Sequence, residues 1–482
     1  MDAPELERRT RHAYHLATKW QSPSCEPEKM VIFDATSATP LTDLRFLPGH
    51  DGKWLLTVSQ GIWSVMSLWD IGDGLRRIVD WSPKNGQLHG FAVNTDPDSP
   101  ATLVVSIFEE RSVTFQSTDR RSLIHVHTLS SSPLHSWQRI VVLSLQYDPG
   151  SPTIPRFETL GTINTPYKPV SIAGDIIAFS DDTAETMIWN WRESTYAALR
   201  HLEDPGGAWQ PDRCLQVLFL HKSVLVVRAR SIHLFPEPVL GSSDAPAPRY
   251  SPIARHSFGW IDGVSVRENV LETDYDPSHP HSRPPLSILI RSESDDPWAS
   301  DVHSLDLYIL EPNPDFVCSP SSPLGGGAEP DLELDPDPGP ALPHPPPLLS
   351  PLISTSPYIF PPRPSMKVPS ARGSLRCTDV ILGRYGTAVW IHPQDRAITG
   401  LVSPNVHPQD MHPTPEMNET LVAAVFPGPL KQPGYRPTSP VHVQARSVWR
   451  NSFNNWTCID YDEELGRIAL GSSYGRVTIL DL

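Results

Sequence analysis

Apolar residues recur from about residue 30 in short runs of about five to eight residues, which are either continuous or alternate with polar residues. Pro, Gly, Asp and Ser separate the runs, and these residues favour turns. The segment 41–71 shows the plan most clearly, because it predicts strands at 41–47, 54–59 and 64–71 joined by tight turns. The pattern is typical of an antiparallel all-β protein.

The runs group into units that each hold about three strands. Seven units can be recognised, and they span 41–71, 88–129, 170–191, 214–238, 258–312, 377–402 and 456–482. At about 40–45 residues for each blade, seven units occupy roughly 280–315 residues. The repeat therefore predicts an all-β fold, a seven-bladed β-propeller, and leaves open which segment closes the ring.

The N-terminus has a different pattern. Asp2 and Glu5 have the spacing of a capping box. A narrow apolar stripe at helical spacing follows, formed by Ala13, Leu16, Ala17 and Trp20. We therefore predict a short helix over 2–20 and divide the chain into an N-terminal linker helix region, 1–29, and a propeller, 30–482.

Residues 313–370 interrupt the propeller pattern. They contain seventeen prolines, a run of three glycines and an acidic stretch. This composition cannot bury enough apolar surface to offset the entropy lost on ordering. Because blade-like sequence resumes after it, the segment predicts a long disordered Pro-rich loop insertion in one blade.

The chain has 482 residues, with 39 Lys and Arg against 55 Asp and Glu, and a formal net charge of −16. This charge argues against nucleic acid and anionic membranes as partners, because both attract basic surfaces. Five scattered cysteines indicate a reducing compartment, and the N-terminus lacks the apolar segment of a signal peptide. We expect a cytoplasmic or nuclear protein.

Three sequence features could carry chemistry, and each has a simpler structural explanation. The segment 471–475 matches Gly-x-Ser-x-Gly, but a strand follows it where a nucleophile elbow needs a helix and a later His. His125 and His127 would share one face of a strand, without a third metal ligand at a fixed spacing. Acidic clusters lie at predicted turns. We therefore expect no catalytic residue, no cofactor and no metal.

The tryptophans divide into two sets by position. One set falls on or beside predicted strands and is expected in the core between blades: Trp54, Trp63, Trp69, Trp189, Trp390 and Trp456. The other set lies nearer loops, where a large amphipathic side chain can anchor a partner. These protein-interaction candidates are Trp81, Trp209, Trp260, Trp298 and Trp449.

The unit that ends in Ser-Leu-Trp-Asp-Ile at 67–71 resembles a WD repeat, and 187–191 is similar to a relaxed version. In WD repeats the Trp of the third strand joins a hydrogen-bonded set with a Ser or Thr of the second strand, an Asp of the next turn and an upstream His. Ser180 and Asp182 occupy the Ser and Asp positions relative to Trp189. The resemblance implies a degenerate, WD-repeat-like propeller.

A second resemblance covers nearly the whole chain. It looks like the region after the F-box in the large F-box protein family of mushroom-forming fungi, at its opening ELERRTRHAYHLATKWQSP, at LRFLPGHDGKWLLTVS and at its close GRIALGSSYGRVTILDL. In that family an N-terminal F-box docks a Skp-type adaptor of a cullin ubiquitin ligase, and the C-terminal region selects substrates. No F-box precedes residue 5 here, which implies a truncated gene model or a lost docking module.

We therefore expect a protein-interaction module and not an enzyme. By resemblance it is the substrate-recognition part of an F-box type ubiquitin ligase receptor, which binds a protein client on a propeller face. A Skp-type adaptor is a partner only if an upstream F-box exists. Two alternatives stay open: a propeller-scaffold enzyme that uses carboxylates in the central channel, and a scaffold protein without a ligase connection.

Overall fold

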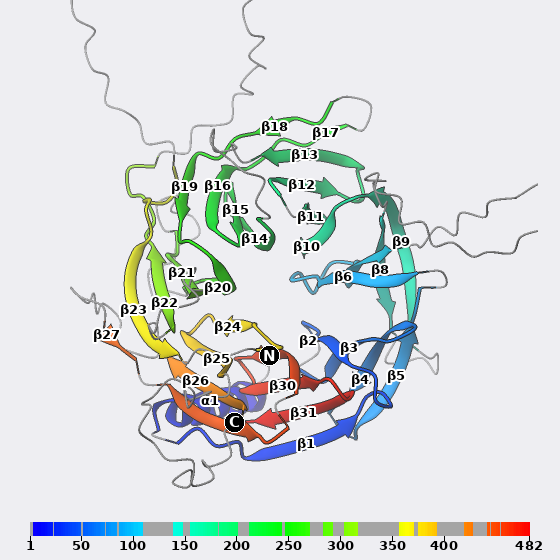
Figure 1. Ribbon diagram of the computed structural model, residues 1–482, viewed down its shortest axis with the longest axis vertical. Helices are drawn as coiled ribbons and strands as arrows, with labels where there is room; N and C mark the ends of the chain where they lie inside the picture. Colours follow the sequence, from blue (N-terminus) through cyan, green and yellow to red (C-terminus); the bar gives the residue numbers. More distant parts are fainter. Residues whose placement is uncertain are drawn as a thin grey trace, which may run out of the picture.

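The structure of the protein is a computed structural model. It describes residues 3–22, 24–49, 52–72, 74–83, 86–108, 138–147, 155–181, 183–200, 212–242, 246–269, 283–292, 303–316, 356–370, 375–392, 419–427, 441–443, 445–453 and 455–482. Seven small sheets stand around a central axis as the blades of a ring (Figure 1). The predicted seven-bladed β-propeller is therefore confirmed.

Each blade has four main strands, numbered outward from the axis. Blade 1 holds β2 (Leu41–Phe46), β3 (Trp54–Gln60), β4 (Ser64–Asp70) and β5 (Arg76–Trp81). Blade 2 holds β6 (Gln87–Val93), β7 (Leu103–Phe108), β8 (Gln138–Gln146) and β9 (Arg156–Thr165). Blade 3 holds β10 (Lys168–Ala173), β11 (Ile176–Ser180), β12 (Glu185–Asn190) and β13 (Thr195–Arg200). Blade 4 holds β14 (Cys214–Leu220), β15 (Ser223–Arg228), β16 (Ser231–Pro236) and β19 (Ala254–Ser257).

The remaining blades follow the same order. Blade 5 holds β20 (Ile261–Glu268), β21 (Leu286–Ser292), β22 (His303–Leu310) and β23 (Arg363–Ser370). Blade 6 holds β24 (Val380–Leu382), β25 (Thr387–His392), β26 (Glu419–Val425) and β28 (Arg446–Asn451). Blade 7 holds β29 (Trp456–Asp462), β30 (Arg467–Ser472), β31 (Arg476–Asp481) and β1 (Lys29–Asp34).

Strand β1 closes the ring. It pairs antiparallel with β31 as the outermost strand of blade 7, from Lys29 opposite Asp481 to Asp34 opposite Arg476. The first and last strands of the chain therefore share one sheet. Opening the ring requires this pairing to break.

The apolar core lies between the blades. Each of the seven apolar clusters formed by described residues spans two neighbouring blades. Five of the six tryptophans predicted to be core are buried: Trp54, Trp69, Trp189, Trp390 and Trp456. Trp63 is the exception, since it lies in the β3–β4 turn and is 66% exposed, so its assignment to the core was wrong.

The strand order gives the ring two unlike faces. Connections between the second and third strands of a blade lie on one face together with the connections from blade to blade, and we name it the upper face. The connections between first and second strands and between third and fourth strands form the lower face. A side chain on a turn can therefore be assigned to a face from the topology.

The predicted N-terminal helix is confirmed as α1 (Ala3–Gln21), which packs against blades 6 and 7 at the lower face. Leu16 and Trp20 of the predicted stripe are buried, whereas Ala13 is exposed. Trp20 meets Tyr461 of β29 edge to face, with 6.0 Å between ring centroids. The helix is therefore held by its C-terminal half.

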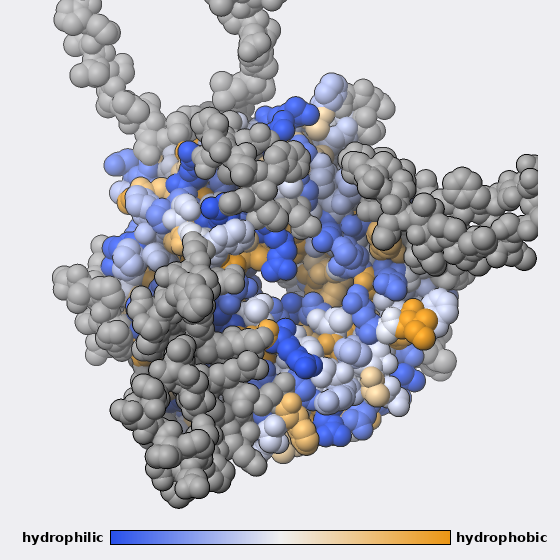
Figure 2. All heavy atoms as spheres, viewed as in Figure 1, coloured by the Kyte–Doolittle hydropathy of each residue, from blue (hydrophilic) through white to orange (hydrophobic). Residues whose placement is uncertain are grey.

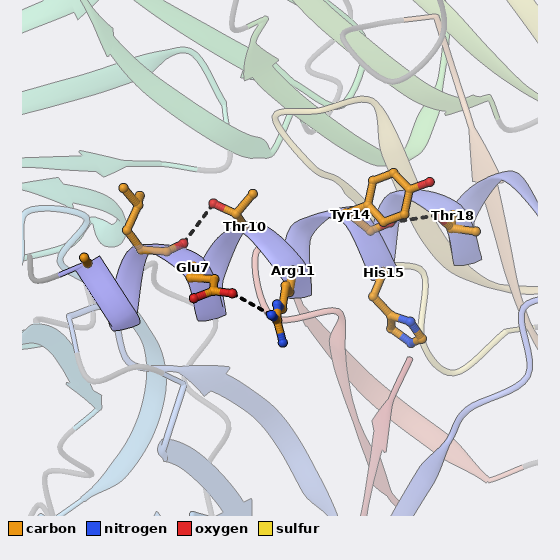
Figure 3. A pocket seen from close by; sticks show the side chains of 8 residues that line it. Glu7, Thr10, Arg11, Tyr14, His15 and Thr18 are labelled. Atoms are coloured by element: carbon orange, nitrogen blue, oxygen red, sulfur yellow. Dashed lines mark hydrogen bonds and ion pairs between the residues drawn. The ribbon is translucent and has the colours of Figure 1, made fainter.

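Arg446 of β28 fixes the end of α1. Its guanidinium donates to the backbone carbonyls of Trp20, at 2.6 Å, and of Ser22. The last carbonyls of a helix have no partner within the helix. The contact satisfies one of these carbonyls, that of Trp20, and the carbonyl of Ser22 just after the helix. The opposite side of α1 faces solvent, where Tyr14 is 77% exposed (Figure 3).

Strand β23 corrects the predicted insertion at 313–370. It lies inside that range, and it pairs with β22 as the fourth strand of blade 5. Its Met366 and Val368 are buried, but Pro364 and Pro369 obscured their alternation. Proline lacks an amide donor and is tolerated on outer strands. Residues 317–355 of the predicted insertion lie outside the described residues.

Two predicted units also end too early. The unit predicted at 88–129 ends before β8, the third strand of blade 2, and the unit predicted at 377–402 ends before β26, the third strand of blade 6. In both blades the connection between the second and third strands is long, whereas the predicted units contain only short turns. The last residues of both predicted units, with His125 and His127, lie outside the described residues.

Two blades carry additional outer strands. In blade 3, β17 (Gly241–Ser242) pairs antiparallel with β13, and β18 (Arg249–Tyr250) pairs parallel with the same strand. In blade 5, β27 (Val441–His442) pairs parallel with β23. The outer edge of a blade in this ring can therefore accept a further strand.

Candidate functional site

Four large apolar side chains are exposed on neighbouring connections of the upper face. They are Ile62 at 87%, Trp63 at 66%, Phe453 at 73% and Tyr474 at 65%. They come from the β3–β4 turn, the connection between β28 and β29, and the β30–β31 turn, which belong to the neighbouring blades 6, 7 and 1 (Figure 1). We name these four residues the rim patch.

Backbone hydrogen bonds join the connections that carry the rim patch. The amide of Ser473 donates to the carbonyl of Asn455 at 2.8 Å, which ties the β30–β31 turn to the connection after β28. The amide of Ala35 donates to the carbonyl of Gly475 at 2.8 Å, which ties the same turn to the segment after β1. The patch is therefore mounted on one continuous rim of blades 6, 7 and 1.

Two glycines bring these segments into close contact. Gly475 has a φ of +78°, and a Cβ there would collide with Thr36. A Cβ at Gly61 would lie 3.2 Å from Cγ2 of Thr39. The segment 35–40 thus contacts both the β30–β31 turn, which carries Tyr474, and the β3–β4 turn, which carries Trp63.

A buried carboxylate holds the connection that carries Phe453. Oε2 of Glu419 accepts hydrogen bonds from the Trp456 amide at 3.1 Å and from Nδ2 of Asn451 at 3.3 Å. Oδ1 of Asn451 in turn accepts from the Phe453 amide at 3.1 Å. Burial raises the pKa of the Glu419 carboxyl, and its hydrogen bonds offset only part of this rise. This network places Phe453 through the backbone and leaves its ring free.

The central channel has a different chemistry. Asp43 and Arg45 of β2 face Asp460 of β29, with the Arg45 guanidinium 3.3 Å from the carboxylate of Asp43 and 3.9 Å from that of Asp460. Oδ2 of Asp460 also accepts a hydrogen bond from the Phe46 amide at 2.7 Å. Both hydrophilic and hydrophobic residues border the opening at the centre of the ring (Figure 2). These charges connect blades 7 and 1 at the axis.

Asp43 has the most unusual titration in this group. Burial in the narrow channel raises the pKa of its carboxyl to about 6, and the negative charges of Asp379 and Asp460 add to the effect. The nearby Arg45 lowers it, but not enough to compensate. The Asp43 carboxyl can therefore gain or lose a proton near pH 6.

Arginines of blade 5 extend the charged wall toward blade 6. Nε of Arg267 donates to the Leu382 carbonyl at 3.2 Å. Arg291, which is 4% exposed, donates to the carbonyls of Thr378 and Ile391, both at 3.2 Å. Like the charges of blades 7 and 1, these groups bond the protein's own backbone. Among the described residues, no three His, Cys, Asp or Glu side chains come together in a way that could hold a metal ion.

The WD-type hydrogen bond is present in blade 1 and absent in blade 3. Nε1 of Trp69 donates to Oγ1 of Thr57 at 3.0 Å, third strand to second strand. In blade 3, Ser180 accepts instead from the buried Arg228 of blade 4, at 3.1 Å, and Trp189 packs against Phe179. Asp182 lies outside the described residues. Only one of the two repeats therefore has the bond that the resemblance implies.

The predicted interaction tryptophans are only in part described, and no observation tests their role. Trp81 is partly buried against the cluster between blades 1 and 2, and Trp449 against the cluster between blades 6 and 7. Trp260 lies on the upper face under the guanidinium of Arg230, 5.0 Å from its ring centroid. Trp209 and Trp298 lie outside the described residues.

Sequence reasoning did not find the rim patch. The sequence places Trp63 beside a predicted strand and Tyr474 inside the Gly-x-Ser-x-Gly match at 471–475, and its pattern singles out neither Ile62 nor Phe453. The hairpin reading of 471–475 is confirmed, since it spans the β30–β31 turn. A usable signal was available: a bulky apolar residue inside a two-to-four-residue turn has no strand face to bury it.

No protein-family model matches the chain, and no curated protein matches it. Helix α1 is too polar to cross a membrane, and the described residues form no other helix.

Proposed function

We propose that this protein recognises another protein through the rim patch. The observation that carries the proposal is the exposure of Ile62, Trp63, Phe453 and Tyr474 on a rim fixed by backbone hydrogen bonds. Large aromatic residues on a rigid support give much contact area at a small entropic cost, which is typical of binding hot spots. A propeller suits this task because its loops vary while its sheets stay fixed.

Site-specific photo-cross-linking tests the proposal. A photoreactive phenylalanine analogue replaces Trp63 in one variant, Tyr474 in a second and Tyr14 of α1 in a third, all expressed in cells of the source organism. Tyr14 is the matched control, since it is an aromatic residue of similar exposure on the opposite face. We expect positions 63 and 474 to capture the same protein and position 14 not to capture it. Capture of unrelated proteins at 63 and 474 would contradict a shared binding surface.

Binding without catalysis is part of the proposal. The channel carboxylates of Asp43 and Asp460 already bond Arg45 and the backbone of β2, so they serve the junction between blades. An enzyme with channel carboxylates would instead need them turned toward a substrate. If the partner cross-linked at position 63 emerged chemically altered, and Asp43→Asn abolished that alteration, the enzyme alternative would replace this proposal.

We further propose that the partner is a client of an F-box type ubiquitin ligase. The support is the resemblance of the opening, the 44–59 region and the closing strands to the region after the F-box in that family. The test is co-precipitation of a Skp-type adaptor and a cullin with the protein at its natural level of expression. A rim partner without the adaptor would favour the scaffold alternative.

A further inference from the structure

The outer strand of blade 7 is unlike the other outer strands. Met30 and Ile32 of β1 are 42% and 49% exposed. Among the described residues, the other large apolar side chains that are this exposed lie outside the strands. By contrast, β5 of blade 1 carries Arg76, Arg77 and Asp80 along its edge. Natural proteins usually protect a free sheet edge with charges in this way. The edge of β1 lacks that protection at its centre.

The backbone of β1 turns alternate groups outward. The amide of Ala35 donates to the carbonyl of Gly475, and because the pattern alternates, Val31 and Phe33 also direct their amides and carbonyls at β31. The alternate residues Met30, Ile32 and Asp34 direct their amides and carbonyls away from blade 7. No described strand pairs with this edge.

Other blades show that such an edge can be extended. Blade 3 takes β17 and β18 on β13, and blade 5 takes β27 on β23, in both antiparallel and parallel directions. In each case the added strand comes from the chain's own loops. The spacing of the blades at the outside of the ring therefore leaves room for one more strand.

We propose that β1 binds an extended segment of the partner protein as a fifth strand of blade 7. Main-chain hydrogen bonds would supply affinity, and Met30 and Ile32 would select apolar side chains at alternate positions. The inference rests on the proposed function, because β1 continues directly into the segment 35–40 that supports the rim patch. The end of β1 is tied to the turn that carries Tyr474, because the Ala35 amide donates to the Gly475 carbonyl.

The charge of the chain decides between a partner and a second copy. Each copy carries −16, so pairing two copies through β1 brings like charges together. A segment of another protein with basic residues on both sides of its apolar positions is instead attracted. The occupant is therefore a basic, alternating apolar peptide segment.

Selection from a random phage-displayed peptide library on the full chain tests this inference. We expect enriched sequences to show alternating apolar residues flanked by Lys or Arg. Synthetic versions are then titrated against the wild type, Ile32→Pro and Ile32→Val. Proline removes only an outward amide of β1, and the bonds of the neighbouring residues to β31 stay, so the loss of affinity should be about tenfold or more. Ile32→Val is the matched control and should bind like the wild type.

Hydrogen exchange of the wild-type chain gives a second measurement that does not depend on folding of a variant. Bound peptide should protect the outward amides of Met30, Ile32 and Asp34, which exchange quickly in the free chain. The inference is overturned if no alternating peptide is enriched, or if Ile32→Pro binds as the wild type does and these amides stay unprotected. Peptides that bind only through Trp63 and Tyr474 would overturn strand addition at β1 and leave the proposed function in place. Cross-linking that finds no common partner at positions 63 and 474 would instead contradict the proposed function.

Discussion

The rim patch and the central channel are held together in opposite ways. On the rim, backbone amides and carbonyls bond one another, as between Ser473 and Asn455, and the side chains of Trp63 and Tyr474 remain exposed. In the channel the side chains make the bonds themselves, as Arg45 and Asp460 do with the backbone of the neighbouring blade. The same junction between blades 7 and 1 contributes to both regions.

This difference indicates which region can bind a partner. A channel charge that turned toward a ligand would have to give up an existing hydrogen bond, at a cost of about 1–3 kcal/mol. A rim aromatic can bind without breaking any bond described in the structure. Recognition is therefore expected on the rim and blade cohesion in the channel, and substitutions can separate the two.

Phe33→Ala should have the largest effect, because it affects both regions at once. Phe33 is buried between blades 7 and 1, with 4.8 Å between its ring centroid and that of Trp69. Truncating a buried Phe typically costs about 3–5 kcal/mol. The variant should unfold at a clearly lower urea concentration, and it should lose rim binding at temperatures where the wild type still binds. Normal stability would show that ring closure does not depend on β1.

Gly475→Ala should affect mainly the rim. The positive φ and the collision with Thr36 predict a loss of about 1–3 kcal/mol in the free energy of unfolding. Because the substitution also displaces the β30–β31 turn, the partner captured at Tyr474 should bind more weakly. Gly259, which has a similar φ of +81° but open space around its Cβ, is the matched control and should cost less when changed to Ala. Equal costs at both glycines would mean that the contact with Thr36 is unimportant.

Arg45→Met should affect mainly the channel. It removes the hydrogen bonds to the carbonyls of Leu44 and Ile459 and leaves Asp43 and Asp460 without their cation. Since the side chain is 35% exposed, the expected loss is about 1–2 kcal/mol in urea unfolding. Rim binding should be unchanged. The pKa of Asp43 should rise further, because Arg45 lowers it more than the hydrogen bond from the Leu44 amide does.

The sequence allowed the ring to be predicted because the inner strands of each blade are short, apolar and regularly spaced. It failed where a strand followed a long connection, as for β8 and β26, or where prolines obscured the alternation, as in β23. Strand β1 could not be assigned to blade 7, because its partner β31 lies at the other end of the chain. That pairing is a property of the closed ring and has no local signal.

The rim patch was harder to predict for a related reason. Trp63 lies beside a strand in the sequence, and only the turn geometry shows that its side chain has no blade face to pack on. The channel charges gave no signal either, because Asp43 and Asp460 are distant in sequence and meet only when blade 7 reaches blade 1. Surfaces built from both ends of the chain thus become visible only in the folded ring.

Asp43→Asn gives the sharpest test of the channel. The folded-state pKa of about 6 lies above the ordinary value near 4 for an aspartate, so between these pH values the folded chain binds a proton that the unfolded chain has released. The contribution of Asp43 to stability is therefore complete below about pH 4 and is lost as the pH rises through about 6.

Asn cannot titrate, so the variant should become more stable relative to the wild type as the pH rises from about 4 to about 6. The measurement is the difference in urea midpoints at pH 4, 5, 6 and 7. Asp70→Asn, which removes a half-buried carboxylate on blade 1 outside the channel, is the matched control. Parallel curves for the wild type and Asp43→Asn would show that the channel hydrates Asp43 fully and that its charge carries no burial cost.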